Sequence, residues 1–278
     1  MSMKYNICKL CKLAGVSRSG YYKWLNGTER FTDRAKENKI IKQLILEIHN
    51  KYRGTYGRKR MCIAINNILS FTVNHKRVYR LMKELNIKSV IRKKVYKRKF
   101  KPSSVADNIL NRDFSADKPL QKLCMDITYI PIDRSARRFL YLNAVKDVFN
   151  GQIIAYDLSL RNDVALVQHT LNKLSKMNLS ESCILHTDQG FQYTRREYSN
   201  FLKKIGVTQS TSRKGNCWDN APIESFFSHL KSELIYLVNT TDVDELTKLV
   251  HEYIYFYNND RIQNKIGMSP IEYLTHAA

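Results

Sequence analysis

Three apolar segments of strand length follow one another after residue 120, and they constrain the fold more than any other feature of the sequence. They cover 120–132 (LQKLCMDITYIPI), 138–149 (RFLYLNAVKDVF) and 152–160 (QIIAYDLSL), with turn residues between them. A helical pattern that Asn162 is expected to cap comes next, followed by alternating short strand and helix patterns. This order predicts a mixed α/β sheet with helices packed against it.

The residues before this region have a helical pattern instead. Residues 7–27 predict two short helices around Gly15, with the spacing of a helix-turn-helix motif. The second helix would present Arg18 and Tyr22 near its N-terminus, where such motifs contact DNA. An amphipathic helix over 34–50 and a second helix pair over 55–86 follow. An ordinary helical hairpin has the same pattern, so periodicity alone leaves DNA binding open.

Positive charge is concentrated in the first part of the chain. Residues 1–110 contain 27 of the 47 lysines and arginines but only 6 of the 25 acidic residues. A basic surface of this kind neutralises phosphates and releases counterions, so nucleic acid is the predicted partner. A solvated charge run or an anionic lipid surface is the alternative. Besides Arg18 and Tyr22, the side chains expected at DNA are Arg58, Lys59, Arg60, Lys76, Arg77, Arg80, Lys93, Lys94 and Arg98.

These patterns predict three parts along the chain. Residues 1–101 form a basic α-helical region, 102–119 a linker, and 120–278 a second domain. No apolar stretch approaches the ~18 residues of a membrane span, and the N-terminus lacks the apolar core of a signal peptide. We therefore expect a cytoplasmic protein with no membrane partner and with reduced cysteines.

Three acidic residues stand where a charge is costly. Asp126 lies inside an apolar strand, Asp188 ends a short buried one, and Glu224 lies in the first turn of an amphipathic helix. A buried carboxylate must meet a cation or take up a proton. Carboxylates from two strands and a helix can converge on Mg²⁺ or Mn²⁺, which prefer oxygen ligands. Two such ions, about 3.5–4 Å apart, stabilise the attacking and leaving oxygens in phosphoryl transfer.

At these residues the sequence resembles the IS-three family of bacterial insertion-sequence transposases, in the part encoded by the second of two overlapping frames. The resemblance rests on DITYI, HTDQGFQYT and SRKGNCWDNAPIESFFSHLKSE, followed by YIYFYNNDRIQNKIGMSPIEYL. The 35 residues between Asp188 and Glu224 match the spacing of the family. LCKLAGVSRSGYYKWL and VNHKRVYRLMKELNI extend the resemblance over nearly the whole chain. The family belongs to the DDE transposases and retroviral-type integrases.

The resemblance implies an RNase H-like, five-stranded mixed sheet in which Asp126, Asp188 and Glu224 are the catalytic metal ligands. It implies two divalent ions, and it places Lys231 beside a phosphate that approaches them; seven residues return a helix to nearly the same face. Leu123 to Met125 depart from the residues usual before the first aspartate, which leaves all the ligands intact and bears on the level of activity.

The function implied is cleavage and strand transfer of double-stranded DNA at the terminal inverted repeats of an insertion sequence and at target DNA, through an excised circle. The implied partners are further copies of the chain on DNA and the upstream-frame protein, or a fusion with it, at the bacterial nucleoid. Two alternatives are a non-catalytic DNA-binding regulator derived from a transposase and an RNase H-like nuclease without strand transfer. The intact triad argues against the first, and the helix-turn-helix-like region argues against the second.

Several residues near the motifs have two interpretations. His186 could act as a base beside Asp188 or be a hydrogen-bonded packing histidine. Trp218 and Asn220 could form a capping turn before Pro222 or contact DNA. Cys8 and Cys11 form a lone C-x-x-C, for which helix packing is favoured over zinc because zinc needs four ligands.

Overall fold

The computed structural model describes residues 6–27, 33–90, 108–111, 113–133, 138–212 and 217–277. The chain divides into two compact units, Met1–Ser89 and Val90–Ala278. Within the predicted linker over 102–119, residues 102–107 and 112 lie outside the described residues. None of the helices within the described ranges combines the length and apolar character needed to cross a membrane.

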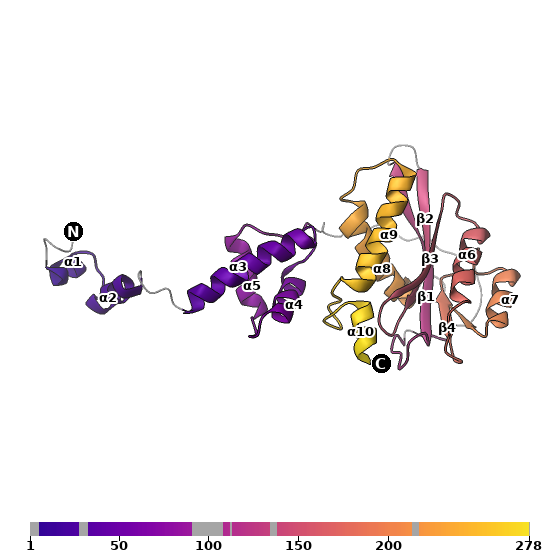
Figure 1. The fold of residues 1–278 in the computed structure, drawn as a ribbon, viewed down its shortest axis with the longest axis horizontal. Coiled ribbons are helices and arrows are strands. Elements are labelled where there is room, and N and C mark those ends of the chain that lie inside the picture. Colours follow the sequence, from indigo (N-terminus) through magenta and orange to yellow (C-terminus); the bar gives the residue numbers. More distant parts are fainter. Residues whose placement is uncertain are drawn as a thin grey trace. The chain divides into compact units, whose positions relative to one another are not determined.

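The first unit is entirely helical in its described residues, as its periodicity predicts. Its elements are α1 (Ile7–Leu13), α2 (Arg18–Gly27), α3 (Asp33–Lys51), α4 (Arg58–Ile68) and α5 (His75–Glu84) (Figure 1). Ser17 and Asn74 cap α2 and α5: their side-chain oxygens accept the N–H groups of Gly20 and Lys76 at 3.0 and 2.8 Å. Helices α3, α4 and α5 pack on one another through buried residues that include Ile45, Met61 and Leu81.

The second unit is built on a five-stranded sheet with the order β3-β2-β1-β4-β5. The strands are β1 (Lys122–Asp133), β2 (Arg138–Asp147), β3 (Ile153–Ser159), β4 (Ile184–Thr187) and β5 (Thr208–Thr211). The first three pair antiparallel, whereas β4 and β5 run parallel to β1. The prediction of a mixed sheet is confirmed, and β1 lies at its centre.

Helices cover both faces of this sheet (Figure 1). One face is packed by α6 (Val164–Leu174) and α7 (Arg196–Lys204), and the other by α8 (Ala221–Leu230) and α9 (Val243–Asn259). Successive residues of β1 alternate between the faces: Cys124 packs in the α8 and α9 cluster, and Met125 in the α6 and α7 cluster. Asp126 therefore belongs to the face that α8 covers.

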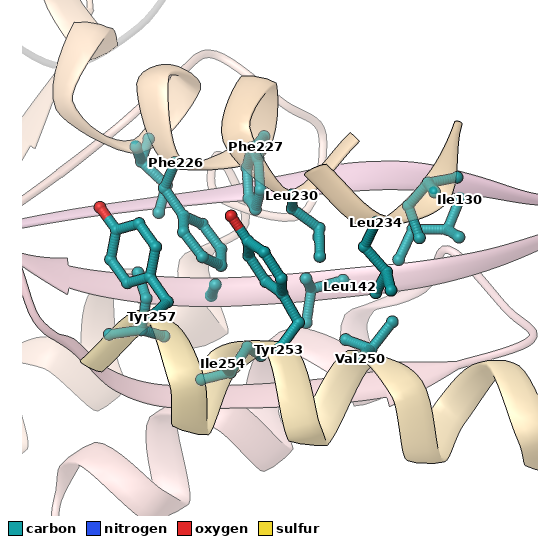
Figure 2. Packing of buried hydrophobic residues seen from close by; sticks show 14 of the residues in the cluster. Ile130, Leu142, Phe226, Phe227, Leu230, Leu234, Val250, Tyr253, Ile254 and Tyr257 are labelled. Carbon is teal, nitrogen blue, oxygen red and sulfur yellow. The ribbon is translucent and has the colours of Figure 1, made fainter. Parts of the chain in front are cut away.

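The contact between α8 and the sheet is a dense apolar layer. Phe226, Phe227 and Leu230 of α8 lie between β1 and β2 on one side and α9 on the other, and Tyr253 and Tyr257 of α9 close the layer (Figure 2). The ring centroids of Phe226 and Tyr257 are 4.8 Å apart in an edge-to-face contact. Burial of a large apolar side chain stabilises a fold by roughly 1.5–3 kcal/mol, so this layer fixes α8 on the sheet.

The structure corrects one predicted cap and adds one helix. Helix α6 is capped by Asp163, whose Oδ1 accepts the N–H of Leu166 at 3.1 Å, and not by Asn162. Either residue type caps well, so sequence alone could not choose between neighbours. Helix α10 (Pro270–Ala277), which contacts α9, was not predicted.

Helix α8 continues into η2 (Lys231–Ile235), a short π-helix in which Tyr236 donates its N–H to the carbonyl of Lys231 at 2.9 Å. A buried ion pair holds this segment. Arg261 Nε and Nη2 donate to the two oxygens of Glu233, each at 2.7 Å, and Tyr253 Oη donates to Glu233 Oε2 at 2.9 Å. Burial alone would lower the pKa of Arg261, but hydrogen bonds and charge from Glu233 keep the pKa above its ordinary value.

Arg261→Met is therefore expected to lower the free energy of unfolding by about 3–5 kcal/mol, because it leaves Glu233 as a buried charge without its cation. The double variant Glu233→Leu with Arg261→Met should recover most of that loss. Urea unfolding followed by circular dichroism measures both, and Arg196→Met, at an exposed arginine, is the control. A single variant as stable as the control would contradict this account.

Candidate active site

The pairing of β1 with β4 brings the first two acidic residues together. The two strands run parallel, with Cys124 opposite His186. Two residues further along each strand are Asp126 and Asp188, the latter directly after the end of β4. The parallel pairing therefore brings both carboxylates to the same end of this strand pair.

The carboxylates also act on one another electrostatically. The pKa of Asp126 is raised well above its ordinary value, first by burial and then by the negative charge of Asp188. The charge of Glu224 raises this pKa further, and that of Lys231 lowers it. The structure thus brings together all three predicted carboxylates and the predicted lysine, within electrostatic range of Asp126. Negative charge is in excess there, which favours a cation.

Asp188 is held by a tight turn in which the N–H of Gly190 donates to Asp188 Oδ1 at 2.8 Å. Its side chain is exposed, yet loss of water around it still raises its pKa, and the Gly190 bond opposes that rise. The turn is tight at Gly190, because a Cβ there would lie 3.0 Å from that oxygen and 3.1 Å from Gln192 Oε1, so these neighbours would have to move slightly for a larger residue.

Two polar contacts fix the start of α8, which bears Glu224, on the sheet. Asn220 Nδ2 donates to the carbonyl of Met125 at 3.2 Å, and Lys146 Nζ donates to the carbonyl of Pro222 at 3.1 Å. Met125 directly precedes Asp126, so the first contact ties the helix to the strand beside the first carboxylate. The flanking apolar residues on α8 are buried, whereas the Glu224 side chain remains exposed. The helix therefore projects this carboxylate from a fixed base.

Lys231 lies at the point where α8 passes into η2. It is half-buried, and burial lowers its pKa while the charge of Asp126 raises it. The position predicted from helical spacing is therefore next to the carboxylates. The α-helical geometry on which that prediction relied ends one residue earlier, at Leu230.

The donor set suits a hard divalent cation, because Asp126, Asp188 and Glu224 offer carboxylate oxygens and the charge of Asp188 raises the pKa of Asp126. Within the described ranges, no three acidic, histidine or cysteine side chains lie close enough to share one metal ion. The arrangement is thus a close pair of carboxylates with a third nearby.

His186 is a structural residue. Its ring is buried, and its Nδ1 and Nε2 atoms lie 2.9 and 3.0 Å from the hydroxyls of Ser210 and Ser212. Burial lowers its pKa to about 4, with the charge of Asp219 opposing the shift. With both ring nitrogens engaged, the ring has no free nitrogen to take up a proton from a substrate, so the packing interpretation is correct.

The sequence prediction overlooked several residues that support the site. Asn220 was interpreted as a possible cap, but as N-cap of α8 it makes no side-chain capping bond and binds β1 instead. Lys146 and Gly190 carried no signal beyond their positions in a strand and a turn. Arg261 lies in the YNNDR stretch, but the sequence predicted no role for it.

The predicted DNA-contact residues divide into two groups. Those exposed on the helices are Arg18, Tyr22, Arg58, Lys59, Lys76 and Arg80. The other group packs against neighbouring helices, because Arg60 is buried over the ring of Tyr56, and Arg77 bonds Glu37 and Asn38 of α3 at 2.8 and 2.9 Å. The guanidinium groups of both residues serve helix packing. Three more residues lie outside the described ranges, namely Lys93, Lys94 and Arg98.

A mixed sheet with acidic residues at two adjacent strands and on the following helix defines an integrase-type core. Two profiles described as integrase core domain match residues 116–217 and 224–277, and a profile described as HTH-like domain matches residues 35–95. The chain belongs to the IS-three family of insertion-sequence transposases, within the DDE superfamily of transposases and integrases.

Known relatives span almost the whole chain. The putative transposase InsK for insertion sequence element IS150 of Escherichia coli K12 is 39% identical over 275 residues, covering 97% of this chain and 93% of the relative. The IS600 31 kDa protein of Shigella sonnei is 34% identical, with 93% and 94% covered. Among solved structures, the HTLV-2 integrase catalytic core in complex with magnesium matches with a TM-score of 0.45 and 15% identity, covering 57% of this chain and 98% of that one.

The turn at Gly190 provides a test of the site. Gly190→Ala should displace the Asp188 carboxylate and weaken Mn²⁺ binding about tenfold, because a Cβ would lie 3.0 Å from Asp188 Oδ1. Isothermal titration calorimetry with Mn²⁺ measures the change. Gly57→Ala is the control, since nothing lies within 4 Å of its added Cβ. Equal Mn²⁺ affinity in both variants would count against the role of this turn.

His186 should make the protein less stable in mild acid. The unfolded chain takes up a proton on this residue near pH 6.5, whereas the folded chain does so only near pH 4. Between these values the unfolded state binds more protons, so stability falls as pH falls, by up to about 3 kcal/mol. Urea unfolding from pH 7 to 4 measures the slope. His186→Gln should unfold more easily at pH 7 but show a smaller acid-dependent loss; an unchanged loss would contradict the assignment.

Proposed function

We propose that this chain catalyses divalent-metal-dependent cleavage and strand transfer of DNA, moving an insertion sequence. The observation that carries the proposal is the meeting of Asp126 and Asp188 on adjacent parallel strands, with Glu224 projected from α8 beside them. A family of transposases with an integrase core supports the reaction class.

Each residue has a separate role in this proposal. Asp126, Asp188 and Glu224 would hold Mg²⁺ or Mn²⁺, which prefer oxygen ligands. The bound ions would supply charge stabilisation at the attacking and leaving oxygens of a phosphodiester. Lys231, close to Asp126, would bind a non-bridging oxygen of the scissile phosphate. The buried contacts of α8 keep these groups in place during cleavage and joining.

The first unit would bind the DNA on which the site acts. Its match to an HTH-like domain and its exposed basic residues, such as Arg58 and Lys59, support this. We assign to it the terminal inverted repeats of the element, with target DNA as the second substrate. The chain would assemble as a homo-oligomer on DNA at the bacterial nucleoid. The upstream-frame protein would take part, either as a separate chain or as a fusion with this one.

One observation favours a second function. The three carboxylates do not form a cluster around a single ion in the described residues. A chain that binds element ends without cutting them would be a DNA-binding regulator derived from a transposase. An RNase H-like nuclease would cut without joining.

Glu224→Gln tests the proposal, because it removes one negative charge from the site and keeps the size of the side chain. We expect at least a thousandfold loss of Mn²⁺-dependent cleavage and joining of labelled element ends, which corresponds to roughly 4 kcal/mol of transition-state stabilisation. Binding of the ends should be unchanged. Glu197→Gln, at an exposed glutamate of α7, is the matched control.

The three functions give different products in this assay. Cleaved and joined strands that disappear in Glu224→Gln support the transposase. Cleavage without joining by the wild type indicates a nuclease. Binding without any cleavage, with or without the upstream-frame protein, indicates the regulator.

A further inference from the structure

Strand β1 continues beyond its pairing with β4, next to the carboxylates. Within the described residues, β1 pairs with β4 only from Lys122 to Cys124, although β1 continues to Asp133. Asp126 and Tyr129 lie on the segment of β1 that follows this pairing. Strand β2 still pairs with that segment, and Asn162 contacts the hydroxyl of Tyr129.

Tyr129 is unusually exposed for the central strand of a sheet. Its side chain is 49% exposed, although neighbouring residues of β1 such as Thr128 and Ile130 are buried. Its ring is braced on the inner side by edge-to-face contacts with Phe139 and Tyr141, at centroid distances of 6.1 and 5.2 Å. By the alternation along β1, Tyr129 belongs to the face that α6 covers, three residues after Asp126, so this half-exposed aromatic residue is placed to meet a substrate that extends past the end of the β1 and β4 pairing.

The hydroxyl of Tyr129 is oriented by the amide of Asn162, which is itself held by the amide of Gln192. Asn162 Nδ2 donates to Tyr129 Oη at 3.2 Å, and Asn162 Oδ1 accepts from Nε2 of the buried Gln192 at 2.5 Å. The hydroxyl thus serves as acceptor toward the protein, and its own proton is available in another direction. Asn162 can make both contacts because Asp163, and not Asn162, caps α6.

The charges nearby favour a neutral donor. Burial, then the neighbouring Tyr141, and then the charges of Asp126 and Asp188 raise the pKa of Tyr129, so the hydroxyl keeps its proton at neutral pH. A lysine here would be drawn into ion pairs with the carboxylates, whereas a tyrosine hydroxyl stays free to bind an incoming anion. Tyrosine hydroxyls are among the groups that bind DNA phosphates.

We infer that Tyr129 is a DNA-contact residue that donates a hydrogen bond from its hydroxyl to a backbone phosphate of the strand end bound at Asp126, Asp188 and Glu224. This inference rests on the proposed function, for which it names a substrate contact. It assigns to Asn162 and Gln192 the role of positioning that hydroxyl.

The test is a binding cycle that does not depend on turnover. Wild type and Tyr129→Phe are titrated with fluorescent duplexes carrying the inverted repeats that flank the gene, in Ca²⁺, with single phosphates replaced in turn by methylphosphonate. Tyr129→Phe should bind the unmodified end about tenfold more weakly. At one phosphate, the replacement should weaken DNA binding by the wild type but have no further effect on DNA binding by Tyr129→Phe.

Tyr141→Phe is the matched control, because Tyr141 belongs to the same aromatic cluster and contacts the same ring. It should bind like the wild type at every position. Additive effects of Tyr129→Phe and methylphosphonate at all positions would overturn the inference, as would unchanged affinity in Tyr129→Phe or a wild type that binds no end. A wild type that binds but neither cuts nor joins contradicts the proposed function alone, and the binding cycle still decides the role of Tyr129.

Discussion

Repulsion between the carboxylates of Asp126 and Asp188 is the unfavourable interaction that packing in the rest of the second unit offsets. Two carboxylates with elevated pKa values stay together only because the chain around them is fixed. Parallel pairing of β1 with β4 sets their level, and Gly190 closes the turn behind Asp188. The apolar layer under α8 supplies free energy that no contact at the site itself provides.

The sequence predicted the parts of this site better than their assembly. Alternating apolar patterns located β1 and β4, and an acidic residue inside one and after the other marked the cation site. Strand order was out of reach, because Cys124 and His186 pair across a long stretch of chain. The cap of α6 and the burial of Arg60 depended on packing that no local pattern reports.

Polar groups hold α8 at its two ends. At its start, Asn220 and the positively charged Lys146 donate to the backbone carbonyls of Met125 and Pro222, which orients the helix on the sheet. Beyond its end, Glu233 and Arg261 form an ion pair away from solvent. Each end of the helix is therefore fixed by bonds between parts of the chain that are distant in sequence.

The π-helix after α8 accommodates one residue more than a regular helical turn. Its hydrogen bond from Tyr236 to Lys231 spans five residues, one more than in an α-helix. The wider turn absorbs the additional residue, so the chain on either side of it keeps its direction. Inside the turn, side chains point in directions that α-helical spacing does not give, and Glu233, which binds Arg261, lies there. Deleting one residue within Lys231–Ile235 would therefore disturb the side chains of this turn before it moved α8.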